Sequence, residues 1–312
     1  MTGQNKFIVL LFIIIFLASL TVLLIASDKF VDSAENIGLS LGIPSFIVGV
    51  TIVAVGTSLP ELATSLAGVF SGSSEIVIGN VVGSNITNIL LVIGATAVVG
   101  KGIKLDYDVM NTDMTKLLAS SFLLYFVLID GSLSRLECVV LLAALVIFLA
   151  NSFSVKNEDE EELPKLRPID FLILAIASVF IYLGAKYTIY GLENIANELS
   201  IPKHIIAITA VALGTSLPEV VVSITAARKG KHAMAVGNVL GSNIFNTYAV
   251  MGISGLVAGS LTIPADAVTI SLPFMIAVTV LFAVSCITKH ITKYEGWLFL
   301  LFYVFFIGLS LQ

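Results

Sequence analysis

The chain has 312 residues, of which 57% are hydrophobic and only 12% charged, and its mean hydropathy is +1.04. Soluble domains carry about 25% charged residues, so this composition excludes an ordinary soluble protein. The net charge of -5 and the lack of a basic run argue against nucleic-acid binding. Cys138 and Cys286 lie inside apolar runs, which is typical of small buried residues and not of a disulfide or metal framework.

Apolar runs separated by charged residues or Gly/Pro breaks predict about ten membrane-spanning helices, because one crossing needs about 20 apolar residues. They cover residues 7–26, 43–70, 76–98, 114–130, 134–153, 169–187, 202–227, 233–258, 264–288 and 294–311. The first run exceeds the usual apolar length of a signal peptide, about 7 to 15 residues, so we expect a retained helix. The expected fold class is an all-α integral membrane protein.

Basic residues in the loops predict the orientation of the helices. When loops are assigned alternately to the two sides, twelve of the sixteen Lys and Arg residues fall on one side: Lys29, Lys101, Lys104, Lys116, Lys156, Lys165, Arg167, Arg228, Lys229, Lys231, Lys289 and Lys293. This side is expected to be cytoplasmic, in a multi-pass protein of the cell membrane with both termini outside. The acidic stretch within 154–168 is then a solvated cytoplasmic linker.

An internal repeat joins the two halves of the chain. A shift of 158 residues superimposes residues 35–94 on residues 193–252 without a gap, with about 28 identities in 60 positions. We expect one five-helix repeat in residues 1–153 and a second in 169–312. Since five is odd, the second repeat must cross the membrane in the opposite direction. Inverted repeats of this kind place the substrate site of a transporter near the midplane, where the repeats meet.

The identities gather in polar blocks within apolar runs, GTSLPE (56–61 and 214–219) and GSNIxN (83–88 and 241–246). An ionised carboxylate inside a membrane is costly unless it has a partner, so Glu61 and Glu219 are candidate functional residues. A protonated, hydrogen-bonded structural Glu is the alternative. Pro60 and Pro218 lack an N–H and collide with the preceding turn, so each helix is expected to break at its acid and free backbone carbonyls. The freed carbonyls belong to the turns that begin at Ala54 and Ala212.

Hydroxyl and amide side chains accompany the acids. Thr57 and Ser58 precede Glu61 by four and three residues and so lie near its face, as Thr215 and Ser216 do for Glu219. Ser84 with Asn88, and Ser242 with Asn246, are four residues apart and form a polar stripe on each following helix. Interhelical hydrogen bonding is the alternative role for these stripes.

The residues beside these stripes have other expected roles. We expect Asn85 and Asn243 to satisfy backbone groups, and the glycines at 79, 83, 237 and 241 to allow close helix packing. The candidate site is a set of hard oxygen ligands, which suits calcium or sodium better than zinc or copper.

The paired GTSLPE and GNxxGSNIxN motifs, in inverted halves of a ten-helix chain, resemble the cation/calcium exchanger superfamily and specifically its prokaryotic sodium/calcium exchangers. The resemblance covers nearly the whole chain. It implies an antiporter that exports calcium against sodium by alternating access, with three sodium ions for each calcium. Its transported ions would be its only metal partners, with no cofactor, no obligate protein partner and the lipid bilayer as its surroundings.

The resemblance also implies a ligand set. Glu61 and Glu219 match the calcium-binding acids and Asn88 a central amide. The remaining matched ligands of sodium or calcium are Thr57, Thr215, Ser58, Ser216, Ser84, Ser242 and the carbonyls of Ala54 and Ala212. Asn246 stands where many exchangers carry Asp, so this site has two acids and not three.

Three other functions agree less well with the sequence than sodium/calcium exchange does. A proton-coupled calcium antiporter is the nearest alternative, but its usual GNxxE motif is absent, since Gly83 follows Val82 where that Glu would stand. A passive channel usually needs a ring of subunits around its pore. An intramembrane hydrolase that used Ser58 or Ser216 would lack a His or Lys base in either block.

Overall fold

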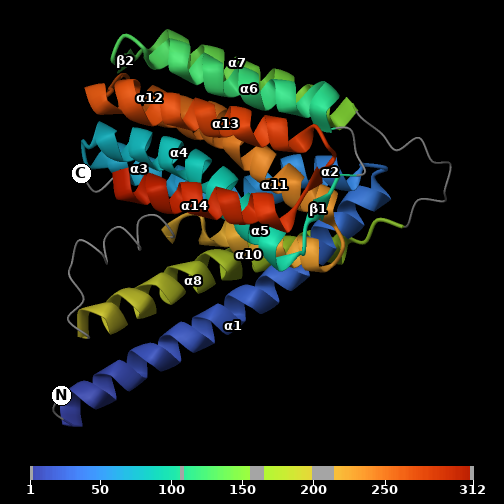
Figure 1. Cartoon of the computed structure of the whole chain (residues 1–312), viewed down its shortest axis with the longest axis vertical. Coiled ribbons are helices and arrows are strands. Elements are labelled where there is room, and N and C mark those ends of the chain that lie inside the picture. Colours follow the sequence, from blue (N-terminus) through green and yellow to red (C-terminus); the bar gives the residue numbers. More distant parts are fainter. Residues whose placement is uncertain (1–2, 106–108, 155–164, 199–213, 310–312) are drawn as a thin grey trace.

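The computed structural model describes residues 3–105, 109–154, 165–198 and 214–309, which form a bundle of helices joined by short turns (Figure 1). The first half contains α1 (Gly3–Ser40), α2 (Ser45–Val48), the π-helix η1 (Gly49–Val53), α3 (Ala54–Phe70), α4 (Ser74–Thr87), the π-helix η2 (Asn88–Ile93), α5 (Gly94–Val99), α6 (Val109–Leu128) and α7 (Arg135–Ser154). The second half contains α8 (Pro168–Glu198), α10 (Leu217–Arg228), α11 (His232–Phe245), the π-helix η3 (Asn246–Val250), α12 (Met251–Ala258), the π-helix η4 (Ala267–Ser271), α13 (Leu272–Cys286) and α14 (Lys293–Leu309).

The helices are those of a membrane protein. In the described part of the chain, six helices are long and apolar enough to cross a bilayer: Ile8–Ser40, Ser45–Phe70, Ser74–Val99, Arg135–Ser154, Pro168–Glu198 and Ala267–Cys286. The apolar runs predicted from the sequence coincide with helices wherever the structure describes them. Two helices are longer than predicted, since α1 extends well past residue 26 and α8 past residue 187. The start of the predicted run 202–227 lies outside the described residues.

The long helices α1 and α8 lie side by side and extend beyond the rest of the bundle (Figure 1). Glycines allow this close approach, because a Cβ atom added at Gly184 would come within 2.9 Å of Leu23. A polar contact also crosses the pair, where the Thr188 hydroxyl donates to Ser19 Oγ at 3.0 Å. The two helices belong to different halves of the chain and occupy equivalent positions in them.

Two short antiparallel ribbons repeat the interval of 158 residues. β1 (Ile103–Lys104) pairs with β4 (His290–Ile291), and β2 (Ser132–Leu133) pairs with β3 (Leu261–Thr262). Each ribbon thus joins a strand of one half to a strand of the other, and β1 corresponds to β3 as β2 corresponds to β4. The ribbons lie at opposite ends of the bundle, β2 at the left and β1 at the right of Figure 1.

The centre of the bundle is formed by α11, whose residues from Met234 to Ile244 are all buried. It packs against α2, η1 and α3 of the first half. A Cβ atom at Gly237 would lie 2.4 Å from the Phe46 carbonyl oxygen, and one at Gly241 would lie 2.1 Å from the Val50 carbonyl oxygen. The expected packing role of glycine is therefore confirmed for these two residues. This close packing brings the polar residues of α11 into contact with those of α3.

Candidate cation-binding site

The two carboxylates predicted from the repeat lie at the centre of the bundle. Glu61 is in the middle of α3 and Glu219 in the first turn of α10, and both are fully buried. They are close enough to interact electrostatically. Among the described residues, neither forms an ion pair with Lys, Arg or His. Two buried acids without a protein counter-charge are a site that favours a cation.

Hydroxyl groups of one half contact polar groups of the other half. Ser58 Oγ of α3 donates to Glu219 Oε1 at 3.3 Å, so the two GTSLPE blocks meet directly. Thr57 Oγ1 lies 3.5 Å from Ser242 Oγ, and the equivalent pair, Ser84 and Thr215, is 3.3 Å apart. The repeat therefore forms two equivalent Thr–Ser pairs, each across the boundary between the halves.

Asn88 and Asn246 are held by amides of the opposite half. Asn88 Nδ2 donates to Asn243 Oδ1 at 3.0 Å, and Asn246 Nδ2 donates to Asn85 Oδ1 at 3.2 Å. Each hydrogen bond occupies the amide nitrogen and thereby fixes the orientation of the side chain. Both residues stand at the first position of a π-helix, η2 and η3, and single-turn π-bulges often accompany functional sites.

The expected role of Asn85 and Asn243 needs correction. Asn243 Nδ2 does donate to a backbone carbonyl, that of Asn85, at 3.1 Å. The Oδ1 atoms of both residues, however, accept the amides of Asn88 and Asn246. Their main contribution is thus to orient the two central amides, across the boundary between the halves.

Five buried side-chain oxygens of these residues have no hydrogen-bond partner in the described structure. They are both carboxylate oxygens of Glu61, Oε2 of Glu219, and Oδ1 of Asn88 and of Asn246. The helices that carry them pack together, since α10 contacts η2 and α3 contacts η3. An unpaired buried acceptor costs about 1 to 3 kcal/mol. Their number and hard character fit a calcium or sodium ion, which takes oxygen ligands.

The expected helix breaks differ between the halves. In the first half, α3 continues as an α-helix from Ala54 through Pro60 to Phe70, so the break predicted at Pro60 is wrong. The local irregularity instead precedes α3, in the π-helix η1. In the second half, α10 begins at Leu217, with Pro218 in its first turn, so a boundary does precede the acid. Proline fits a first turn because its missing N–H has no partner there anyway.

The remaining predicted ligands lie around the acids where the structure describes them. The Ala54 carbonyl lies 3.4 Å from Thr57 Oγ1, from which it can accept a hydrogen bond. Ser216 is buried, immediately before α10. Ala212 lies outside the described residues.

Two asparagines that were not assigned a role belong to the same polar layer. Asn80 Nδ2 donates to the Glu61 carbonyl and to Ser65 Oγ, both at 2.8 Å. Asn238 Nδ2 donates to Ser223 Oγ at 2.9 Å, and Asn238 Oδ1 accepts from Thr57 Oγ1 at 3.2 Å. Their signal in the sequence was the repeated GN dipeptide, a polar residue at equivalent positions of two apolar runs.

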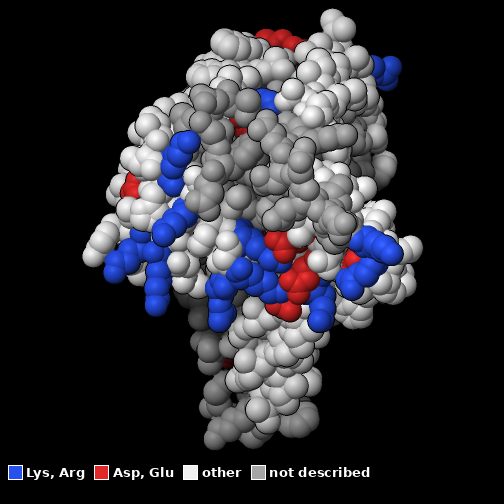
Figure 2. All heavy atoms as spheres, turned by 90° about the vertical axis from the view of Figure 1, so that its right-hand side faces the viewer, with Lys and Arg blue, Asp and Glu red and all other residues white. Residues whose placement is uncertain are grey.

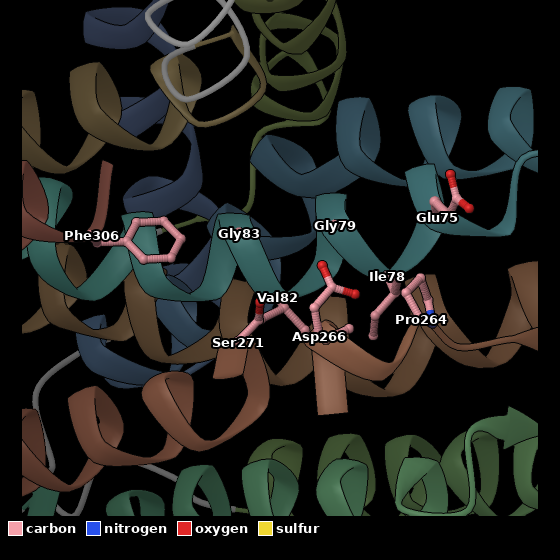
Figure 3. Close-up of a pocket in the computed structure, with 10 residues that line it drawn as sticks. Glu75, Ile78, Gly79, Val82, Gly83, Pro264, Asp266, Ser271 and Phe306 are labelled. Carbon is pink, nitrogen blue, oxygen red and sulfur yellow. The ribbon is translucent and has the colours of Figure 1, made fainter. Parts of the chain in front are cut away.

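Residues of the repeated polar blocks line two cavities. One, of about 410 Å³, runs between α4 and η4, with the carboxylates of Glu75 and Asp266 and the backbone of Gly79 and Gly83 on its wall (Figure 3). A Cβ atom at either glycine would have no described atom within 4 Å. These glycines therefore line a cavity, unlike their tightly packed counterparts at 237 and 241.

The second cavity, of about 350 Å³, lies between α8 and the acid-bearing helices and reaches Thr215. Its wall includes Lys186 and Glu193 of the distal part of α8, which points to the left in Figure 1. Glu75 of the first cavity follows the α3–α4 turn, at the same end of the bundle as β2. Both cavities thus lie toward one end of the molecule.

Comparisons with known proteins give a consistent result. The family described as "Sodium/calcium exchanger protein" matches residues 11–154 and again residues 169–312. The sodium/calcium exchanger MaX1 of Methanosarcina acetivorans is 34% identical, over 94% of this chain and 97% of the relative. The inner membrane protein YrbG of Escherichia coli is 32% identical, over 86% of this chain and 87% of the relative.

Solved structures agree with the sequence relatives. The sodium–calcium exchanger NCX_Mj, soaked with zero sodium and calcium, superimposes with a TM-score of 0.85 and 32% identity. The match covers 97% of this chain and all of that one.

Proposed function

Because the chain belongs to the sodium/calcium exchanger protein family, we propose that it is a secondary antiporter that exports calcium in exchange for sodium by alternating access. The observation that carries the proposal is the set of five unpaired oxygens of Glu61, Glu219, Asn88 and Asn246. Two carboxylates balance the charge of one calcium ion. The same oxygens, with the hydroxyls of Thr57, Thr215, Ser84 and Ser242 and the Ala54 carbonyl, supply further ligands for sodium.

An inverted repeat supports alternating access. The two halves share the interval of 158 residues in their motifs, in their π-helices at Asn88 and Asn246 and in their ribbons. If the halves are equivalent, each can adopt the packing that the other has now. In this proposal, α4 and α11 are equivalent helices, and each alternates between the packed surroundings that α11 has now and the open surroundings that α4 has now. Ten crossings in two five-helix repeats, joined by a linker at 154–168, remain our proposal for the topology.

The surface supports the proposed orientation. Figure 2 shows that Lys and Arg gather on the right-hand face of Figure 1, the end of the bundle that carries β1. Positive residues accumulate on the cytoplasmic side of membrane proteins. We therefore assign this end to the cytoplasm and place both termini outside the cell membrane. The two cavities then face the exterior, so the described state is open outward.

Purified protein in lipid vesicles tests the function. Calcium-45 should accumulate in sodium-loaded vesicles when external sodium is low, and it should not accumulate when a pH gradient or a potassium gradient replaces the sodium gradient. Accumulation driven by a pH gradient alone would favour the proton-coupled alternative. The Glu61→Gln variant, reconstituted at equal density, is the matched control for leak.

A further inference from the structure

Asn238 is a buried amide whose two ends make different contacts. It is fully buried near the middle of α11. Its Nδ2 donates to Ser223 Oγ of α10 at 2.9 Å, and its Oδ1 accepts the Thr57 hydroxyl proton of α3 at 3.2 Å. The contact to Ser223 occupies the nitrogen end and so points the oxygen toward Thr57. Asn238 of the second half thus provides a hydrogen-bond acceptor for the Thr57 hydroxyl of the first half.

The direction of the Thr57 proton decides what that hydroxyl can bind. A hydroxyl has one proton and two lone pairs, and only a lone pair can coordinate a cation. If Asn238 is removed, the nearest described acceptor for the Thr57 hydroxyl on α3 is the Ala54 carbonyl oxygen, at 3.4 Å. If the Thr57 proton pointed to the Ala54 carbonyl, this hydrogen bond would occupy the carbonyl oxygen as well. When Asn238 accepts the proton, the lone pairs of Thr57 and the Ala54 carbonyl both stay available to a cation.

We propose that Asn238 is a positioning residue for the cation site: it accepts the Thr57 proton and so turns Thr57 and the Ala54 carbonyl into cation ligands. The inference rests on the proposed function, in which Thr57 binds a transported ion. Sodium depends on this arrangement more than calcium does, because a monovalent ion gains less from the carboxylates and relies more on neutral oxygens.

The counterpart of Asn238 in the first half supplies a control within the same molecule. Asn80 keeps the contact to its own serine, with Nδ2 donating to Ser65 Oγ at 2.8 Å, as Asn238 does to Ser223. Its nitrogen also donates to the Glu61 carbonyl, and in the described structure no hydrogen bond joins it to Thr57. Removing Asn80 therefore disturbs the same type of residue in the same motif but leaves the Thr57 proton in place.

A double-mutant cycle tests the assignment. The measured quantity is the sodium concentration that half-saturates calcium-45 exchange in lipid vesicles. Asn238→Ala should raise it about fivefold, the size expected for the loss of one hydrogen bond. Thr57→Val should raise it as well, and adding Asn238→Ala to Thr57→Val should then change nothing further. Asn80→Ala should change the half-saturating sodium concentration by the same factor in the parent and in the Thr57→Val variant.

The outcomes separate the inference from the function on which it rests. If Thr57→Val leaves the sodium requirement unchanged, Thr57 is no ligand and the proposed site fails. If Thr57→Val weakens sodium use but Asn238→Ala adds its full effect to it, the positioning role is wrong and the exchanger assignment stands. Should Asn238→Ala fail to fold, Ser223→Ala, which frees the amide to turn, replaces it in the cycle with Ser65→Ala as its control. Full additivity of Ser223→Ala with Thr57→Val would equally overturn the inference.

Discussion

Gly241 and Gly83 occupy equivalent positions in the two halves but have opposite surroundings. A Cβ atom at Gly241 would lie 2.1 Å from the Val50 carbonyl oxygen and 2.7 Å from Ala54 Cβ. A Cβ atom at Gly83 would meet no described atom within 4 Å. The same change to alanine therefore tests whether the two halves are in different states.

The size of the effect follows from these distances. Real Cβ atoms are essentially never closer than 3.0 Å to another heavy atom, so Gly241→Ala forces a backbone displacement of about 1 Å. Overpacking of this kind costs typically 1 to 3 kcal/mol. Replacing a helical glycine by alanine returns about 0.5 to 1 kcal/mol. The net expectation is a destabilised Gly241→Ala variant and a Gly83→Ala variant that is at least as stable as the parent.

Thermal unfolding of the purified proteins, measured together with transport, checks both expectations. Gly241→Ala should unfold several degrees lower than the parent. Gly83→Ala should unfold at the same temperature or higher and yet exchange calcium slowly, because the repeat symmetry predicts that the opposite half packs on Gly83 in the inward-open state. Full transport by Gly83→Ala, or an undiminished unfolding temperature of Gly241→Ala, would refute the reasoning.

Five further substitutions test the site itself. Glu61→Gln or Glu219→Gln should each abolish calcium exchange, since one remaining carboxylate cannot neutralise a divalent ion, and near-normal exchange by either variant would remove that acid from the site. Pro218→Ala should raise the half-saturating sodium concentration more than Pro60→Ala, because α10 begins beside Pro218 whereas α3 runs through Pro60; equal effects would contradict this difference. Asn246→Asp should make calcium exchange more pH-dependent, since a buried carboxyl favours its protonated form; an unchanged pH profile would mean that position 246 is remote from the ions.

The membrane helices and the acids could be predicted from the sequence because their physical causes are local. A run of apolar residues requires a helix in a bilayer, and a carboxylate such as Glu61 within it stands out at once. The repeat then made Glu219 its equivalent. The lengths of α1 and α8 were underestimated because polar residues such as Asp28 and Glu193 interrupt the apolar pattern although the helix continues.

Contacts between the halves could not be predicted in the same way. Asn85 and Asn243 are expected to serve the backbone, and Asn243 does donate to the Asn85 carbonyl. Their Oδ1 atoms, however, accept amides that lie far away in sequence. Gly79 and Gly237 are equivalent in the sequence, and only the packing of α11 on η1 distinguishes them. A sequence repeat describes what the two halves share, whereas the state of an exchanger lies in how they differ.

The charge of the site predicts how the exchanger responds to voltage. In the described residues, no group of three or more His, Cys, Asp or Glu side chains comes together as a metal site. The charge of the proposed site is therefore that of the two carboxylates, Glu61 and Glu219. Together with one calcium ion they carry no net charge, and with three sodium ions, the ratio that the family resemblance implies, they carry one positive charge. Each cycle then moves one charge, which corresponds to about 2.3 kcal/mol per 100 mV if the charge crosses the whole field. Calcium uptake by sodium-loaded vesicles, with the potential clamped by potassium and valinomycin, tests the direction of this charge movement. Three sodium ions leaving for one calcium export one positive charge, so uptake should accelerate when the interior is made positive and slow when it is made negative. Indifference to the clamp would refute the three-to-one ratio and indicate an electroneutral exchange of two monovalent ions for one calcium.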